Sequence, residues 1–207
     1  KMSHLHFAST EAYGARIVQM GEQPDRVFVS GAPGLDNLDG FVPLSDAELE
    51  NRIGMSLDPA PLLVTIHPVT LEHGSTKAGI DSLLSALTAI AMPVVFTYPN
   101  ADTHGQVIIE AITDYVKIHP LSRAVKSLGT QGYFSLLARA SAMVGNSSSG
   151  IIEAASFELP VVDIGIRQKG RIRGKNCIHA EDAADAIQTA IGKALDPDFR
   201  GSLRGMT

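Results

Sequence analysis

The sequence has a single cysteine, Cys177, and no tryptophan among 207 residues. One cysteine excludes an internal disulfide framework and argues against a cysteine-rich metal site. Aromatic residues make up only 5% of the chain, and its formal net charge is −5. A protein that binds nucleic acid usually carries a basic surface, often with aromatic side chains on which bases stack. We therefore expect no nucleic acid partner.

Long apolar runs are also absent. No stretch approaches the roughly 18 apolar residues that span a bilayer, and the first residues lack the apolar core of a signal peptide. We therefore expect a cytoplasmic protein with no membrane partner. The length predicts one domain, or a domain with a fragment of another, and a hydrophobic content of 44% is enough for a sizeable core.

Short β-branched runs alternate with amphipathic stretches along most of the chain. The expected strands are residues 62–66, 93–97, 115–118, 142–144 and 160–164. The expected helices are residues 78–91, 105–115, 133–140, 148–157 and 180–195. This alternation predicts an α/β fold, a doubly wound, Rossmann-like parallel sheet covered by helices on both faces. Such sheets bind ligands at the carboxyl ends of their strands, so the informative loops follow Ile66, Thr97, Val144 and Ile164.

The first part of the chain has a different pattern. Strands are expected at residues 4–7 and 27–30 around a helix at residues 10–20, and Ser45 with Glu48 has the spacing of a capping box. We interpret residues 1–45 as a lead-in or linker segment from an interdomain region, and residues 46–207 as the Rossmann-like domain.

The sharpest motif is Gly-Asn-Ser-Ser-Ser-Gly at residues 145–150, between an expected strand and an expected helix. Free backbone N–H groups at a helix start favour an anion such as phosphate, and serine hydroxyls can cap the helix or donate to a ligand. An ordinary serine cap after a tight turn explains the spacing equally well, since it matches neither the P-loop nor the dinucleotide fingerprint. Glu153, one turn later, could bind ribose hydroxyls. The alternative is an acidic residue with no ligand, which the helix dipole favours near the helix N-terminus.

Five of the nine residues from Arg167 to Lys175 are basic. Positive charge just after a parallel strand suggests diphosphate binding, in which arginine offers a bidentate fork. The alternative is a solvated surface loop. His4 and His6 would point to one face of a strand, as a metal pair, an acid/base site or structural residues. No carboxylate and histidine cluster with metal spacing accompanies them, so we predict no metal and no cofactor.

Taken together, several segments resemble the UDP-N-acetylglucosamine 2-epimerase family. They are SHLHFASTEAYGARIVQMGEQPDRVFVSGAPGLDNL, LVTIHPVTLE, FTYPNAD, RAVKSLGTQGYFSLLARASAMVGNSSSGIIEAA and LPVVDIGIRQKGRIRGKN, in this order. The resemblance implies one half of a GT-B-type two-domain fold, namely the C-terminal nucleotide-binding domain with its lead-in. The other domain would supply the catalytic carboxylates. We therefore expect residues 1–207 alone to bind UDP weakly and to lack substantial epimerase activity, and the longer protein to form a homo-oligomer.

The resemblance also assigns roles to single residues. The candidate for acid/base chemistry is His6, although a contact with the nucleotide is the role that we favour. Diphosphate binding is implied for Ser147, Ser148 and Arg167, and ribose binding for Glu153. A place in the nucleotide pocket is implied for Asn100, and contacts with uracil, partly through backbone groups, are implied for Leu128 and Tyr133.

The motifs favour the hydrolysing branch of the family. Non-hydrolysing members resemble HRREN and DSGGxQEE where this chain has HPVTLE and GNSSSGIIEA. The resemblance therefore implies conversion of UDP-N-acetylglucosamine to N-acetylmannosamine and UDP, for synthesis of sialic-acid-like sugars, with a diacetamido sugar as a possible substrate. The alternatives are a non-hydrolysing epimerase, another GT-B glycosyltransferase that uses a UDP-sugar, and an isolated nucleotide-binding module.

Overall fold

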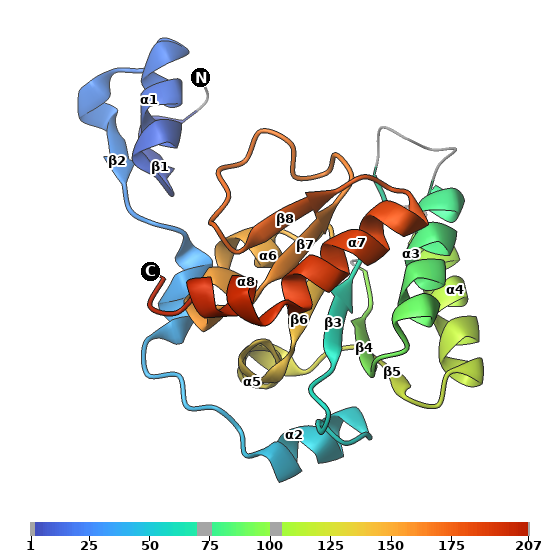
Figure 1. Ribbon diagram of the computed structural model, residues 1–207. Helices are drawn as coiled ribbons and strands as arrows, with labels where there is room; N and C mark the ends of the chain where they lie inside the picture. The colour runs from blue at the N-terminus through green and yellow to red at the C-terminus, as the bar shows by residue number, and fades with distance from the viewer. Residues whose placement is uncertain (1–2, 70–75, 100–104, 207) are drawn as a thin grey trace. The chain divides into compact units, whose positions relative to one another are not determined.

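The computed structural model describes residues 3–69, 76–99 and 105–206. The chain divides into two compact units, Lys1–Phe41 and Val42–Thr207 (Figure 1). Within the described ranges, none of the helices combines the length and the apolar character that crossing a membrane requires. Whether residues 1–45 come from an interdomain region of a longer protein stays a prediction.

The larger unit contains a six-stranded sheet in which every pairing is parallel. The spatial order is β5-β4-β3-β6-β7-β8. The strands are β3 (Leu62–Thr65), β4 (Val94–Thr97), β5 (Ser122–Val125), β6 (Ala142–Gly145), β7 (Val161–Ile164) and β8 (Cys177–Ala180). The chain starts in the middle of the sheet, adds strands to one edge, returns to the middle and adds strands to the other edge. This is the strand order of a doubly wound Rossmann fold, so the predicted fold class is confirmed.

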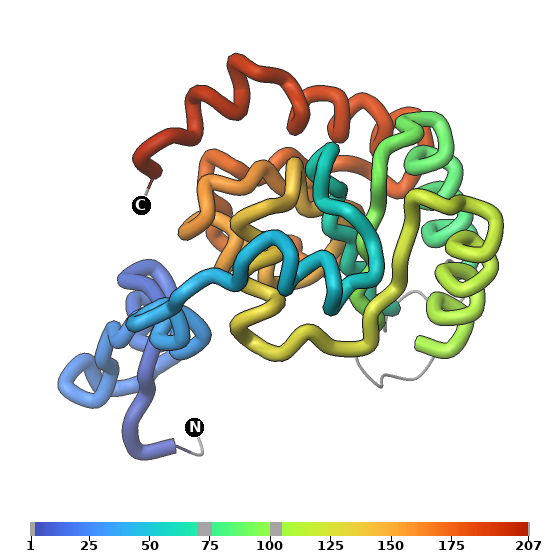
Figure 2. The backbone as a smooth tube through the Cα atoms, turned by 90° about the horizontal axis from the view of Figure 1, so that it is seen from below, coloured from blue at the N-terminus to red at the C-terminus, as the bar shows by residue number. Residues whose placement is uncertain are grey.

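Helices cover both faces of this sheet. One face packs against α3 (Thr76–Ile90), α4 (Gly105–Ile118) and α7 (Ala184–Leu195), whose buried aliphatic side chains join those of alternate strand residues in one core. The other face carries α5 (Gly129–Arg139), the short α6 (Ser149–Ile152) and the 3-10 helix η3 (Ala154–Phe157). Figure 2 shows α7 and α5 on opposite sides of the sheet. Because both faces are buried, the strands are continuous apolar runs, as the sequence indicated.

Two further helices complete the larger unit. Helix α2 (Asp46–Ile53) begins with the predicted capping box, in which Glu48 N–H donates to Ser45 Oγ at 3.3 Å and Ser45 N–H donates to Glu48 Oε2 at 3.0 Å. Helix α8 (Pro197–Ser202) follows α7 and was not predicted.

Three predicted elements were wrong in part. Residues 115–118 extend α4 instead of forming a strand, because Tyr115 continues the buried helical stripe of Ile108 and Ile112; the next strand is β5, later in the chain. Residues 148–157 form α6 and η3 instead of one helix, since glycine and β-branched isoleucine favour a helix weakly. Ala180 ends the unpredicted strand β8 instead of starting α7.

The smaller unit is a parallel pair of short strands with one connecting helix. Its elements are β1 (His6–Ala8), α1 (Glu11–Gln19), η1 (Pro24–Arg26), β2 (Val27–Val29) and η2 (Pro33–Leu38). These bounds confirm the predicted strands and helix to within a few residues. Helix α1 packs through Gly14 against the side chains of Val27 and Val29. Phe7 and Phe28 are register partners on the other face, where their rings stack at 5.6 Å and are exposed to solvent.

Candidate functional site at the centre of the sheet

The centre of the larger sheet is its topological switch point. There β3 lies beside β6, and the connections that follow these two strands leave toward opposite edges of the sheet. In an open α/β sheet this divergence leaves a crevice at the carboxyl ends of the two strands, where ligands bind. The residues that follow β3 and β6 therefore define the candidate site.

Gly145 ends β6 where its backbone touches that of β3. Its φ is +138°, a conformation that favours glycine. A Cβ on Gly145 would lie 2.7 Å from the carbonyl carbon of Thr65, its register partner, and closer still to the carbonyl oxygen. Only glycine fits this approach, which places the start of the following turn directly over the end of β3.

Asn146 joins the loops that follow the two central strands. Its Oδ1 accepts from the His67 N–H at 2.8 Å, and its Nδ2 donates to the His67 carbonyl at 2.9 Å. Its own carbonyl accepts from Arg167 Nη1 at 3.0 Å and from Gln168 Nε2 at 2.7 Å. Both Asn146 and Gln168 are almost fully buried. Sequence reasoning missed both residues; the available signal was a pair of polar amides directly after, or near, the ends of buried strands.

The serine turn presents donors at this crevice. Ser147 Oγ accepts from the Ser149 N–H at 3.3 Å, and Ser148 is the first residue before α6 with no capping bond from its side chain. In the described part of the chain, the N–H groups of Ser147 and Ser148 have no hydrogen-bond acceptor. Helix α6 is only 4 residues long, so its dipole is small. The capacity to bind an anion therefore rests mainly on these donors, and not on a long helix as expected.

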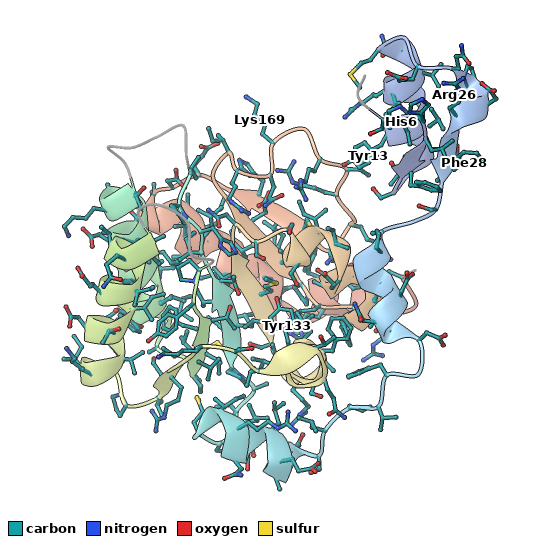
Figure 3. All side chains as sticks on the ribbon, turned by 180° about the vertical axis from the view of Figure 1, so that it is seen from behind. His6, Tyr13, Arg26, Phe28, Tyr133 and Lys169 are labelled. Carbon is teal, nitrogen blue, oxygen red and sulfur yellow. The ribbon has the colours of Figure 1, made fainter. Side chains whose placement is uncertain are left out.

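Tyr133 approaches the turn from α5, between the helix and the sheet (Figure 3). Its hydroxyl donates to Ser149 Oγ at 2.7 Å. Burial raises the pKa of Tyr133 to about 12, with a smaller upward contribution from the Glu153 carboxylate. Leu128, directly before α5, is 8% exposed. The hydroxyl of Tyr133 thus belongs to the polar surroundings of the turn.

Glu153 lies directly after α6, and its Oε2 is buried. Among residues 3–69, 76–99 and 105–206, no group donates a hydrogen bond to this oxygen. A buried carboxylate oxygen without a donor is destabilising by about 1–3 kcal/mol or more. Such an atom is satisfied when a ligand or a water donates to it.

The structure separates the basic residues after β7 by role. Arg173 donates to Asp163 Oδ2 through Nε at 3.0 Å and Nη2 at 2.7 Å, and Asp163 is 1% exposed. Lys175 donates to the Ser202 carbonyl at 2.7 Å, whereas Lys169 projects from the loop into solvent (Figure 3). Of this run, Arg167 is the residue bonded at the turn. The basic segment is therefore partly a structural anchor and partly a solvated loop, and the role of Arg167 in diphosphate binding stays a prediction.

The same ion pair lies beside Cys177. Burial, with a smaller contribution from the nearby Asp163 carboxylate, raises the pKa of its thiol to about 11, and Arg173 opposes the shift. The thiol is therefore protonated at neutral pH and is a poor nucleophile.

Not all predicted site residues lie in this unit or in the described ranges. The structure brings together Tyr133, Ser147, Ser148, Glu153 and Arg167 around one turn, and Leu128 directly precedes the helix that carries Tyr133. His6 belongs to the Lys1–Phe41 unit, where its Nε2 lies 3.2 Å from Glu22 Oε2. Asn100 lies outside the described residues. Among those that are described, no group of three or more His, Cys, Asp or Glu side chains could hold a metal ion.

Known proteins match this chain along its whole length. The family description "UDP-N-acetylglucosamine 2-epimerase" matches residues 1–207. A UDP-N,N'-diacetylbacillosamine 2-epimerase (hydrolyzing) from Legionella pneumophila is 40% identical over 196 residues, which are 95% of this chain and 52% of that protein. A GDP/UDP-N,N'-diacetylbacillosamine 2-epimerase (hydrolyzing) from Campylobacter jejuni is 39% identical over 202 residues, 97% of this chain and 52% of that protein. The chain thus spans about half the length of these relatives.

A solved structure supports the same assignment at the level of the fold. The S. aureus protein MnaA, solved with UDP, superimposes with a TM-score of 0.78 at 13% identity, over 100% of this chain and 55% of that chain. This likeness, over about half of a longer chain, confirms the expected half of a GT-B-type two-domain fold. Since the family description covers every residue, the chain belongs to the UDP-N-acetylglucosamine 2-epimerase family.

Proposed function

We propose that the turn at residues 145–150 binds the diphosphate of UDP, and that Glu153 binds its ribose. The observation that carries this proposal is a pair of complementary groups at one turn. Within the described residues, the N–H donors of Ser147 and Ser148 have no acceptor, and the buried Glu153 Oε2 has no donor. A nucleoside diphosphate complements both, since its phosphates only accept and its ribose hydroxyls can donate. Arg167 supplies the cation beside the diphosphate.

We further propose that the intact protein is a hydrolysing 2-epimerase. In this reaction the C2 proton of the sugar is removed and the C1–O bond to UDP breaks, which leaves a C1–C2 double bond. Water then adds across that bond, with a proton returning to C2 from the other face. Negative charge builds on the departing diphosphate, and the turn's N–H groups, the Ser148 hydroxyl and Arg167 stabilise it electrostatically. Uracil lies near Leu128 and Tyr133.

Two parts of this proposal depend on residues beyond the turn. His6 contacts the nucleotide phosphate or takes part in proton transfer, and the carboxylates that move the C2 proton come from the half of the protein that this chain does not span. The relatives named above also bear on the substrate. Because they act on diacetamido sugars and are about two-fifths identical to this chain, we propose UDP-N,N'-diacetylbacillosamine as a substrate beside UDP-N-acetylglucosamine.

The binding site is tested by calorimetric titration of the intact protein with UDP. Glu153→Gln removes the carboxylate charge, and Arg167→Lys keeps the charge but removes the guanidinium fork. Each change is expected to weaken UDP binding about 10-fold or more, because each removes a charge-assisted hydrogen bond. The matched controls Glu181→Gln and Arg204→Lys lie at exposed positions and should bind UDP like the wild type. Unchanged affinity in both site variants would place the nucleotide elsewhere.

The reaction is tested by the products that the purified intact protein forms from each UDP-sugar. A hydrolysing epimerase releases UDP and the free 2-epimer in equal amounts. A non-hydrolysing epimerase keeps the epimerised sugar attached to UDP, and a glycosyltransferase releases UDP in proportion to an added acceptor. UDP binding with no turnover by the intact protein would indicate a nucleotide-binding module. Residues 1–207 alone are expected to give no substantial turnover.

A further inference from the structure

A row of hydroxyl side chains runs from the carboxyl ends of β4 and β3 to the serine turn at residues 145–150. Thr97 of β4 and Thr65 of β3 share a hydrogen bond between their Oγ1 atoms. The Thr65 hydroxyl also opposes the rise in the pKa of Tyr133, and the Tyr133 hydroxyl donates to Ser149 Oγ at 2.7 Å. Four elements of the fold thus place hydroxyl side chains in one row, and the proposed function gives no role to the hydroxyl of its last member, Ser149.

The hydrogen bonds in this row of hydroxyls have a direction, because each hydroxyl has only one proton to donate. Tyr133 gives its proton to Ser149, so its oxygen can act only as an acceptor toward the neighbouring Thr65 hydroxyl. Ser149 receives a proton and keeps its own, for which the described residues offer no acceptor. Hydrogen bonds in such a row polarise one another, which makes the terminal hydroxyl a better donor. Since the pKa of Tyr133 is raised to about 12, its phenol remains a donor throughout the neutral range.

The Glu153 carboxylate lies one helical turn from the Ser149 hydroxyl. Among the described residues, the first has an oxygen with no donor and the second has a proton with no acceptor. Ser149 and Glu153 are four positions apart, and the Glu153 N–H donates to the Ser149 carbonyl at 2.9 Å. Side chains with this spacing lie on one face of a helix. Glu153 Oε2 is buried and receives no hydrogen bond from the part of the chain that the structure describes, while Ser149 is only partly buried and remains accessible. A phosphate could accept from Ser149, but it would repel the Glu153 carboxylate. A ligand hydroxyl can accept from Ser149 and donate to Glu153 at the same time.

We propose that Ser149 is a further ligand-binding residue, whose hydroxyl donates to the nucleotide ribose hydroxyl that donates to Glu153, and that Tyr133 is the positioning residue that orients it. This proposal rests on the proposed UDP site and adds to it a second contact at the ribose. It also gives Tyr133 a role through its hydroxyl in addition to a place beside uracil.

The test is a set of titrations of the intact protein with UDP, 2′-deoxy-UDP and 3′-deoxy-UDP. Ser149→Ala and Tyr133→Phe are each expected to weaken UDP binding about 5- to 10-fold, as for loss of one hydrogen bond. The double variant should bind UDP no more weakly than Ser149→Ala, because both changes interrupt the same chain. For the deoxynucleotide that lacks the contacted hydroxyl, the wild type and Ser149→Ala should bind equally, a result that a merely structural role would not produce.

Two control variants distinguish a loss of affinity caused by misfolding from one caused by a lost contact with the nucleotide. Ser156→Ala removes an exposed serine hydroxyl, and Tyr115→Phe removes a phenol hydroxyl that lies on the other face of the sheet; both should bind UDP like the wild type. If Tyr133→Phe fails to fold, Ser149→Ala alone decides. The proposal for Ser149 would be overturned if Ser149→Ala lost the same affinity for all three nucleotides, or lost none for any. Weaker UDP binding by Glu153→Gln in the same experiment would still support the UDP site. Absence of UDP binding by the wild type would overturn both.

Discussion

Replacing Gly145 with alanine is expected to cause the largest loss of stability of any single methyl group added to this fold, about 4 kcal/mol or more. The new Cβ would lie 2.7 Å from the Thr65 carbonyl carbon and would overlap the carbonyl oxygen. These are backbone atoms of the central strand β3, so they move only if β3 and β6 separate. A φ of +138° is in addition strained for alanine.

Urea unfolding of the intact protein measures this loss, with Gly192→Ala as the control. Gly192 lies inside α7, where a Cβ would meet no atom within 4 Å. Alanine there should raise the free energy of unfolding by about 0.5–1 kcal/mol, since it favours a helix more than glycine does. A Gly145→Ala variant that unfolds within about 1 kcal/mol of the wild type would contradict the steric argument.

Asn146→Asp is expected to have the second largest effect, a loss of about 3 kcal/mol at neutral pH together with UDP affinity at least 10-fold weaker. The change is isosteric, but it replaces the amide group that donates to the His67 carbonyl with a carboxylate oxygen that repels it. The site is almost fully buried, so water cannot compensate. The turn that holds Ser147 would then separate from the loop after β3.

The sign of the pH dependence follows from the same contact. A protonated aspartic acid can donate to the His67 carbonyl, so the native state favours the protonated form and the pKa of the new carboxyl is raised. The destabilisation relative to the wild type should therefore shrink as the pH falls and grow as the pH rises. Asn176→Asp is the matched control, because Asn176 is also buried and donates to the Leu159 carbonyl at 2.9 Å, away from the turn. It should lose stability but keep the UDP affinity of the folded protein; equal affinity losses in both variants would contradict a specific role for Asn146.

The sequence predicted those features that depend on neighbours in the chain. Apolar runs such as residues 62–65 identified the strands, and the Ser45–Glu48 spacing identified the start of α2. The short strand β8 was missed, because Cys177–Ala180 contains an exposed histidine and is too short to show a period. Residues 115–118 were misassigned because four apolar and polar residues fit either a strand or the last turn of a helix.

In the candidate site, too, the sequence predicted local features and missed contacts between distant residues. Motif and resemblance identified Ser147, Ser148, Glu153 and Arg167, whose roles stay predictions. They gave Asn146 no role, although it lies in the motif at residues 145–150, because its partner His67 is 79 positions away and only the fold brings the two together. The Tyr133–Ser149 bond was missed for the same reason: a hydroxyl pattern in a sequence does not show which hydroxyls meet.

The Asn146–His67 pairing also affects when the site forms during folding. Contacts between residues this far apart have a loop-closure entropy cost that delays them, and Arg167 and Gln168 must also be in place before the turn is complete. A nascent chain on the ribosome therefore acquires its proposed nucleotide pocket only after both halves of the sheet have been synthesised. Nucleotide would then bind the finished domain and not its intermediates, and at 100 times the dissociation constant it would stabilise the native state by about 2.7 kcal/mol.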